Sequence, residues 1–409
     1  MNKEKRRVPK LRFPGFTEDW EQRKFKDLFM ERREKTIREN EETLLSCAIT
    51  GIYLNSELFS HFRGSSTIGY LKIKKYDLIL SAQNLHLGNA NINLSFDKGM
   101  ISPAYKVFEL KSIDPYFINA WVKKDSTKNF FLKATTEGAS QCRKNIEWDV
   151  LLNQEIPVPN KLEQRTIGRF INNIDMIITL HQRKLEHLIL KKKALLQKLF
   201  PKNGERYPEL RFSEFTDAWE QRKLGECMNS FAYGLNAAAK DYDGMHKYIR
   251  ITDIDDETHN FIQSNLTSPD IDFNMDVSDY KLNVGDIVFA RTGASVGKTY
   301  LYNPNDGDLY YAGFLIRGEV KEDCDAGFIY QNTLTKEYDS FIRITSQRSG
   351  QPGVNSKEYA TFKLNIPCKD EQEKISKVLN SLDELYTLHQ RKLEHLQLQK
   401  KALLQQMFV

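Results

Sequence analysis

The sequence predicts a mixed α/β (α+β) protein with an internal pseudo-twofold repeat, in which two globular domains are separated by two long helices that form an antiparallel coiled coil. A leader, PKLRFPGFTEDWEQRK at 9–24, returns as PELRFSEFTDAWEQRK at 208–223. A helical segment at 179–200 returns at 387–408 with 18 of its 22 positions identical. The segments between these copies have diverged. Repeated flanks around divergent inserts therefore predict two related domains on a duplicated scaffold.

The repeat sets the expected boundaries. We expect an N-terminal domain with its leader at 1–160 and a central helix at 161–200. A C-terminal domain with its linker and leader follows at 201–368, and a second helix at 369–409. The length of 409 residues suits two or three domains.

Composition limits the function classes. Hydrophobic residues make up 40% and charged residues 28%, which is typical of globular proteins. No apolar run reaches the roughly 18 residues of a membrane span, and the basic N-terminus lacks the apolar stretch of a secretory signal. The five cysteines are widely spaced and form no CxxC pair. We therefore expect a cytoplasmic protein without a disulfide scaffold or a zinc site.

Both helical segments carry a seam in which spacings of four and three residues alternate. Eight of ten seam positions are apolar in each helix, which is typical of a coiled coil. The apolar seam residues are Ile167, Ile171, Ile174, Ile178, Leu185, Leu188, Leu195 and Leu199, then Ile375, Leu379, Leu382, Tyr386, Leu393, Leu396, Leu403 and Met407. Histidine (His181, His389) and lysine (Lys192, Lys400) fill the same two polar places in each copy. Polar seam residues more often fix register than bind metal, so no metal site is expected.

The connection between the copies predicts the helix directions. Only the short stretch 201–208 separates the first helix from the second leader, so the second domain starts near the far end of that helix. The second helix must then run back along the first to bury its seam. At 1.5 Å per residue, 167–199 would span ~50 Å and hold the two domains apart.

Each divergent segment shows strands and two polar loops. In the second segment, strands are expected at 248–254, around 286–301 and at 310–317, followed by a helical stretch around 328–345. The early loops contain Gln83, Asn84 and His86 in the first domain, and Arg291, Thr292, Ser295 and Lys298 in the second. The late loops, at 135–145 and 346–356, contain Gln141, Arg143, Lys144 and Asn145, then Gln347, Arg348 and Gln351. We expect DNA contacts in the late loops, since arginine pairs with guanine and glutamine with adenine in the major groove, and the early-loop residues are further candidates. Ordinary solvated loops explain any single one of these residues nearly as well.

Two stretches resemble catalytic motifs and fail their tests. GASVGKT at 293–299 has three residues between its glycines, where a phosphate-binding loop has four, and a strand rather than a helix is expected after it. Asp114-Pro115-Tyr116-Phe117 resembles the DPPY motif of amino-methyltransferases but lacks the second proline and a glycine-rich cofactor loop. No cofactor fingerprint is found, so we expect no catalysis by this chain alone.

The charge distribution adds one DNA candidate on a helix. Residues 161–200 hold nine basic and three acidic residues, whereas 201–368 hold 18 basic and 26 acidic ones. Lys191, in a run of three lysines, is a candidate contact to DNA phosphates. A solvated face or a protein interface explains the same lysines equally well.

Together, the duplicated LRF…F…W leader, GDIVFARTGASVGK, the IP…EQ stretch that starts each helix and the LHQRKLEHL helices resemble the specificity (S) subunit of Type I restriction–modification enzymes. The resemblance covers nearly the whole chain. In the first copy, Tyr76-Asp77 replaces Gly-Asp and SAQNLHLGN replaces ARTGASVGK, which suggests a different half-site.

The resemblance implies two target recognition domains that each read one half of a split DNA sequence. It also implies partners: double-stranded DNA, two modification subunits that carry S-adenosylmethionine and methylate adenine, and restriction subunits that use ATP and Mg²⁺. The chain itself would bind no cofactor. Two rival hypotheses remain at this level: a self-sufficient methyltransferase or nuclease, and a coiled-coil adaptor without DNA specificity.

Overall fold

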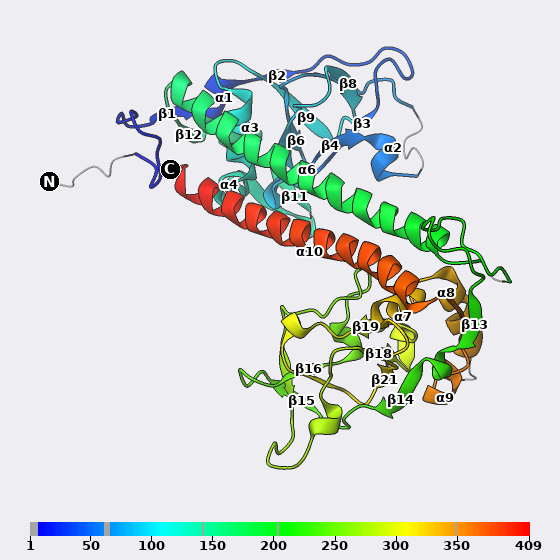
Figure 1. Ribbon diagram of the computed structural model, residues 1–409. Helices are drawn as coiled ribbons and strands as arrows, with labels where there is room; N and C mark the ends of the chain where they lie inside the picture. The colour runs from blue at the N-terminus through cyan, green and yellow to red at the C-terminus, as the bar shows by residue number, and fades with distance from the viewer. Residues whose placement is uncertain (1–6, 61–65, 141–142, 203, 348–349) are drawn as a thin grey trace. The chain divides into compact units, whose positions relative to one another are not determined.

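The computed structural model describes residues 7–60, 66–140, 143–202, 204–347 and 350–409 (Figure 1). The chain divides into two compact units. Unit 1 comprises Met1–Gln182 and Arg391–Val409, and unit 2 comprises Arg183–Gln390. Each unit therefore combines one globular domain with one half of each long helix.

A four-stranded antiparallel sheet forms the centre of the domain in unit 1. Its strand order is β2–β9–β6–β7, with bounds Phe29–Arg32, Tyr105–Leu110, Leu78–Ser81 and Ala90–Ile92. The other strands pair in twos: β1 (Glu21–Lys24) with β12 (Glu155–Val158), β3 (Leu45–Ala48) with β4 (Gly51–Leu54), β5 (Leu71–Lys74) with β8 (Lys98–Ile101), and β10 (Thr135–Ser140) with β11 (Arg143–Ile146). The helices are α1 (Phe25–Leu28), α2 (Asn55–Leu58), α3 (Pro115–Lys123), α4 (Asp125–Leu132) and α5 (Trp148–Asn153), with a 3₁₀ turn η1 (Leu85–Leu87).

The domain in unit 2 repeats this sheet. The order β14–β21–β18–β19 has the bounds Met228–Tyr233, Leu315–Val320, Asp286–Ala290 and Thr299–Leu301, and every pair is antiparallel. Paired strands flank it: β13 (Glu220–Lys223) with β22 (Lys363–Ile366), β15 (Ala239–Asp241) with β17 (Thr267–Pro269), and β16 (Lys247–Ile249) with β20 (Leu309–Tyr311). The helices are α7 (Ala326–Asn332), α8 (Lys336–Thr345) and α9 (Ser356–Tyr359), with 3₁₀ turns η2 (Leu224–Glu226), η3 (Ile251–Asp253), η4 (Ser278–Tyr280), η5 (Gly293–Ser295) and η6 (Pro304–Asp306).

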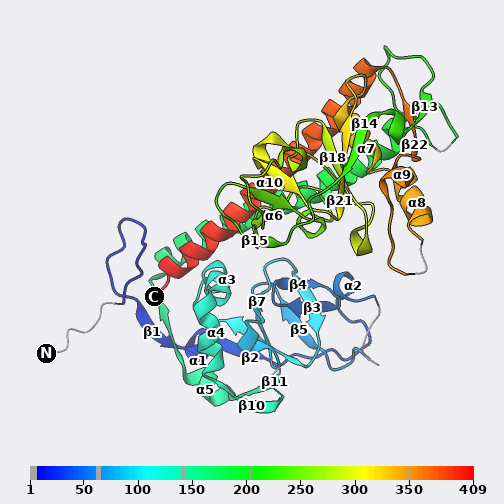
Figure 2. The ribbon, with the colours of Figure 1, turned by 90° about the horizontal axis from the view of Figure 1, so that it is seen from below.

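The two long helices are α6 (Lys161–Leu199) and α10 (Lys369–Gln406). In unit 1 the first half of α6 lies beside the last turns of α10 (Figures 1 and 2), where Ile167 and Ile171 share a core with Leu404 and Met407. In unit 2 the end of α6 shares a core with the start of α10. The predicted antiparallel pairing is confirmed within each unit, and no seam position in either helix is exposed.

An aromatic triad explains the tryptophan of each leader. Trp20 packs edge-on against Phe117 of α3 and against Phe408, with ring centroids 5.8 and 6.0 Å away. Trp219 meets Phe328 of α7 at 5.7 Å and Phe200 at 6.2 Å. Both tryptophans are at most 2% exposed. The leader therefore joins a domain helix to the end of a long helix in each unit.

Several expected elements are corrected by the structure. The strand expected at 248–254 ends at Ile249 and continues as η3, because the arginine at 250 and Asp253 close a turn. The strand expected at 310–317 is two strands with a turn at 312–314 between them. The late loop expected at 135–145 is the hairpin β10–β11. The helical stretch around 328–345 is confirmed as two helices, α7 and α8.

Candidate nucleic-acid interface

The signature residues of the helix starts hold the scaffold together. Glu163, whose side chain is 1% exposed, accepts two hydrogen bonds from the guanidinium of Arg12, each 2.7 Å long. Glu371 accepts the same pair from Arg211, at 2.8 Å each. A bidentate arginine–carboxylate pair is strong and directional, and the bond to Glu163 raises the pKa of Arg12. The leader arginine and the helix-start glutamate are therefore structural residues.

The glutamine that follows each glutamate positions a domain helix. Gln164 accepts from the backbone N–H of Asp114 at 2.9 Å, and Gln372 accepts from that of Asp325 at 2.9 Å. These two aspartates cap the N-termini of α3 and α7 with their side chains. The stretch at 114–117 that resembled a methyltransferase motif is thus a helix cap. GASVGKT likewise folds as η5 followed by strand β19, without a helix N-terminus for phosphate.

Buried acids explain the Gly-Asp positions of the two domains. Gly285 has φ +95°, and Tyr76, which replaces it in the first domain, has φ +73°. The left-handed backbone is therefore kept without glycine. Asp77 and Asp286 follow as buried carboxylates, and burial raises the pKa of each. Asp77 accepts from Arg32 at 2.9 Å, so this pair belongs to the framework of the domain.

In unit 2 the early and late polar loops join into one surface. The N–H of Gly293 donates to the carbonyl of Pro352 at 3.0 Å, and the N–H of Val354 donates to that of Arg291 at 2.9 Å. Gly293 has φ +74°, and a Cβ there would lie 3.1 Å from Nε2 of Gln351. The left-handed backbone at this position favours glycine. Gln347 and Gln351 are exposed on the late loop, while Arg348 lies outside the described residues.

Two aromatic residues that the sequence analysis missed border this surface. The guanidinium of Arg291 lies over the ring of Tyr233, 5.1 Å from its centroid. The N–H of Arg291 donates to the carbonyl of Phe314 at 3.0 Å. Tyr233 is 42% and Phe314 56% exposed, which is high for aromatic side chains. A signal existed in the sequence, since each lies beside a glycine at one end of a strand in the central sheet.

The remaining early-loop candidates of this domain lie elsewhere or are already bonded. Lys298 forms an ion pair with Asp256 at 2.5 Å and donates to the carbonyl of Ile254 at 2.9 Å, and its side chain is 11% exposed. Ser295 and Lys298 line a cavity of about 750 Å³ next to the long helices. Thr292 donates to Pro352 at 3.4 Å. Of the four, Arg291 and Thr292 therefore belong to the joined loops.

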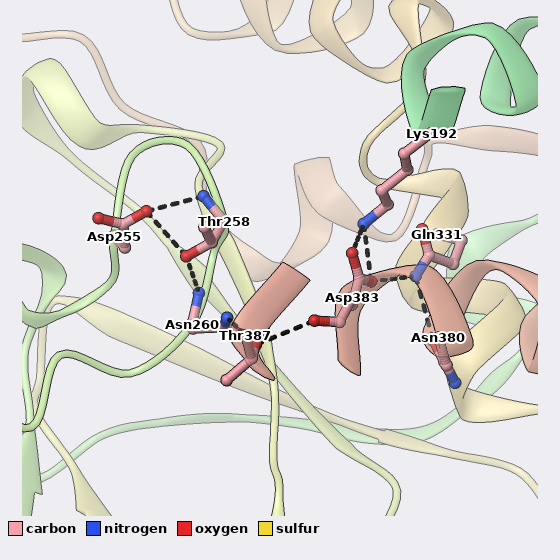
Figure 3. Close-up of polar contacts among 8 residues, drawn as sticks. All are labelled: Lys192, Asp255, Thr258, Asn260, Gln331, Asn380, Asp383 and Thr387. Carbon is pink, nitrogen blue, oxygen red and sulfur yellow. Dashed lines mark hydrogen bonds and ion pairs between the residues drawn. The ribbon is translucent and has the colours of Figure 1, made fainter. Parts of the chain in front are cut away.

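A polar network, some of whose residues line this cavity, connects this domain to the long helices (Figure 3). Lys192 forms an ion pair with Asp383 at 2.7 Å, and Gln331 of α7 donates to the same carboxylate at 3.2 Å. Asn260 reaches Thr387 of α10 at 3.5 Å. Lys192, Asp383 and the amide nitrogen of Gln331 thus bind one another across the domain and both long helices, so the network is structural.

In unit 1 the early-loop residues Gln83 and Asn84 are exposed and His86 is half-buried. Burial, and then the charge of Lys144, lowers the pKa of His86. The hairpin β10–β11 thus lies close enough to η1 for Lys144 to act on this ring. Asn145 is exposed and Lys144 half-buried. Gln141 and the side chain of Arg143 lie outside the described residues.

On the helices, Lys191 is exposed, whereas its neighbour Lys192 is half-buried and paired. Within the described residues, no group of three or more His, Cys, Asp or Glu side chains could hold a metal ion. None of the described helices has the length and apolar character needed to cross a membrane.

Comparisons with known proteins agree with this arrangement. A model of the Type I restriction modification DNA specificity domain matches residues 17–190 and 216–398. The chain is 22% identical over 379 residues to the Type I restriction enzyme MjaVIII specificity subunit of Methanocaldococcus jannaschii, covering 86% of this chain and 84% of that one. It is 22% identical over 362 residues to the putative MjaX specificity subunit of the same organism, covering 85% and 76%. The solved S subunit of the Type-I restriction-modification system from M. genitalium has the same fold, with a TM-score of 0.62 at 17% identity over 98% of this chain and 99% of that one.

Proposed function

We propose a function for this chain from the premise that it belongs to the family of Type I restriction modification DNA specificity proteins, whose domain occurs twice in it. The chain is a specificity subunit. It recognises a DNA target in two parts and directs methylation and restriction by partner subunits. The N-terminal domain reads one half of the target and the C-terminal domain reads the other.

One observation carries this proposal. The two domains share one sheet order, β2–β9–β6–β7 and β14–β21–β18–β19, and their scaffolds repeat the same contacts, yet their polar loops differ in sequence. A constant frame with variable loops is how proteins change recognition without changing fold. Two such frames with different loops support two different half-sites.

The chemistry belongs to the partners in this proposal. Two modification subunits carry S-adenosylmethionine and methylate adenine, and restriction subunits use ATP and Mg²⁺. This chain supplies DNA contacts and holds the partners on the target, in the cytoplasm. The DNA contacts come from the joined loops of unit 2, from the loop and hairpin of unit 1, and from Lys191 for phosphates.

Mapping methylated adenines tests the proposal. A host that carries this chain with its modification subunit is compared with the same host lacking only this chain. We expect a split methylated sequence with an unspecific spacer that disappears when the chain is deleted. Methylation that persists without the chain would overturn the proposal. Equal binding of the chain and modification subunits to random duplexes would favour an adaptor without DNA specificity.

A further inference from the structure

We propose that Arg291 is a base-contacting, specificity-determining residue of the C-terminal domain and that Tyr233 positions it. This inference rests on the proposed function. It names a residue pair that recognises one base pair of one half-site. A guanine is the base whose edge suits an arginine fork.

Arg291 is held without a neutralising carboxylate. Two other arginines of the domain are paired with acids: Arg250 with Asp253 at 2.8 Å and Arg222 with Asp323 at 3.3 Å. Within the described residues Arg291 has no ion pair, and its guanidinium lies over the face of Tyr233. Stacking on an aromatic ring orients the guanidinium plane while its N–H donors stay available. The side chain is thus charged and oriented, and its N–H donors can bind a base.

The ring beneath it is fixed in turn. The hydroxyl of Tyr233 lies 3.2 Å from Oγ of Ser356 and accepts from the N–H of Ser356 at 3.3 Å. Glu358, an acid whose charge acts on Tyr233, accepts from the N–H of Asn355 at 2.8 Å and so serves the cap of α9. Tyr233 therefore connects the end of β14 to the late loop, and the guanidinium of Arg291 stacks on its ring.

The backbone of Arg291 is locked between two segments. Its N–H donates to Phe314 and its carbonyl accepts from Val354. A side chain on a fixed backbone and over a fixed ring loses little conformational entropy on binding a base. Two exposed side chains lie on the same joined loops: Phe314, whose carbonyl accepts from Arg291, supplies an apolar surface, and Gln351, close to Gly293, supplies an amide. An arginine with only a structural role would not need exposed polar and aromatic side chains around it.

The test compares binding to the mapped target and to every single-base-pair variant of it, with modification subunits present. We expect Arg291→Ala to reduce discrimination roughly 10- to 100-fold at one base pair of the C-terminal half-site and at none of the other half. Arg291→Lys keeps the charge but loses the fork, so it should lose discrimination at the same base pair. Lys357→Ala, which removes an exposed charge on α9, is the matched control and should leave the preference unchanged.

Tyr233→Ala should weaken discrimination at the same base pair, and its effect should not add to that of Arg291→Ala, as expected for residues that act as a unit. Equal losses on every duplex for Arg291→Ala, or full discrimination by Arg291→Lys, would overturn the inference. If the unmodified protein showed no sequence preference, the proposed function itself would fail. Thermal unfolding of each variant identifies any that does not fold, and the Arg291→Lys result then decides.

Discussion

Lys192 and Lys400 are charged residues in an apolar seam, and each meets an aspartate of the opposite helix. Lys192 pairs with Asp383 at 2.7 Å, and Lys400 pairs with Asp175. The four residues occupy equivalent places in the two copies, so one lysine–aspartate pair is repeated in each unit. A paired polar residue in a seam fixes register and direction, because a shifted helix would leave the charge unpaired. The pairs therefore specify the antiparallel arrangement.

Neighbouring lysines of α6 should consequently behave differently. Lys191→Ala should leave stability unchanged, weaken binding to all DNA sequences alike and reduce the salt slope by about one, if Lys191 meets a phosphate. Lys192→Ala removes the ion pair of Asp383 and leaves it only the hydrogen bond from Gln331, so it should cost about 1–3 kcal/mol of stability. Thermal unfolding and DNA binding at two salt concentrations separate the two effects. An unaltered salt slope for Lys191→Ala would remove Lys191 from the DNA contacts.

At the residue scale, much of the helical scaffold was predictable from the sequence, whereas the surface formed by the polar loops was less predictable. The seam residues follow from a strict period, and all are shielded from solvent. The roles of Glu163 and Gln164 were not predictable, since their partners Arg12 and Asp114 are far away along the chain. Tyr233 and Phe314 were missed although each lies beside a glycine in the sequence, because their contacts with Arg291 join segments that are far apart along the chain. Lys298 stays a predicted DNA contact, and its ion pair with Asp256 depends on a tertiary approach that local sequence does not reveal.

At the scale of elements, each domain helix crosses a long helix at very close range. In unit 1 a Cβ on Gly168 of α6 would lie 2.5 Å from the backbone nitrogen of Phe117 in α3. In unit 2 the glycine has moved to the domain helix, where a Cβ on Gly327 would lie 2.1 Å from Oγ of Ser376 in α10. Ser376 is the counterpart of Gly168. One small residue at each crossing thus allows the helices to approach, and either helix can supply it.

This exchange predicts a rescue. Gly327→Ala should destabilise unit 2 by about 1–3 kcal/mol, since the added methyl overpacks the crossing. Adding Ser376→Gly recreates the arrangement of unit 1 and should restore part of that loss, less the cost of a glycine within a helix. Thermal unfolding of the single and double variants measures both steps. Strictly additive losses would show that the two residues do not share one crossing.

The length of α6 offers a second prediction at this scale. Four residues inserted after Leu188 should lengthen the helix by ~6 Å. If α6 sets the distance between the domains, the spacer of the target should grow by one or two base pairs, at ~3.4 Å each. The insertion also shifts the seam and moves Lys192 one turn from Asp383, so some stability loss is expected.

The control inserts the same four residues after Met275, which is 69% exposed in unit 2, and should leave the spacer unchanged. Mapping of methylated sites reads the spacer directly. An active helix-insertion variant with the original spacing would show that α6 does not set the distance.

For the whole molecule, the architecture was predictable because a duplication is visible in the letters of the sequence. The repeat, the seam and the short linker predicted two domains and two antiparallel helices, and the pairing within each unit confirms the helix direction. The shared sheet order of the two domains could not be predicted, since their sequences have diverged and sheet pairing joins distant segments. The prediction of a late loop at 135–145 in the first domain was wrong, because a polar stretch with glycine is also compatible with a β-hairpin.

The repeat also predicts that the domains can be exchanged. The segment 24–155 begins and ends at two residues that face each other, since Lys24 pairs with Glu155 at the end of the β1–β12 ladder. The corresponding pair in unit 2 is Lys223 with Lys363, at the end of β13–β22. Each domain is therefore inserted between paired strand ends, and the leader contact of Arg12 with Glu163 lies outside the exchanged segment.

Replacing 24–155 with the equivalent segment of a relative should change one half of the methylated sequence and leave the other half intact. Replacing 223–363 should change the opposite half. For the chimaera to fold correctly, the donor segment should have a capping residue at position 114. The side chain there starts α3, and its backbone N–H donates to Gln164 of α6. Methylated-site mapping of both chimaeras gives four half-site readings, of which two should match the parent. If either exchange altered both halves together, the domains would not read DNA independently, and specificity would have to arise from the scaffold that they share.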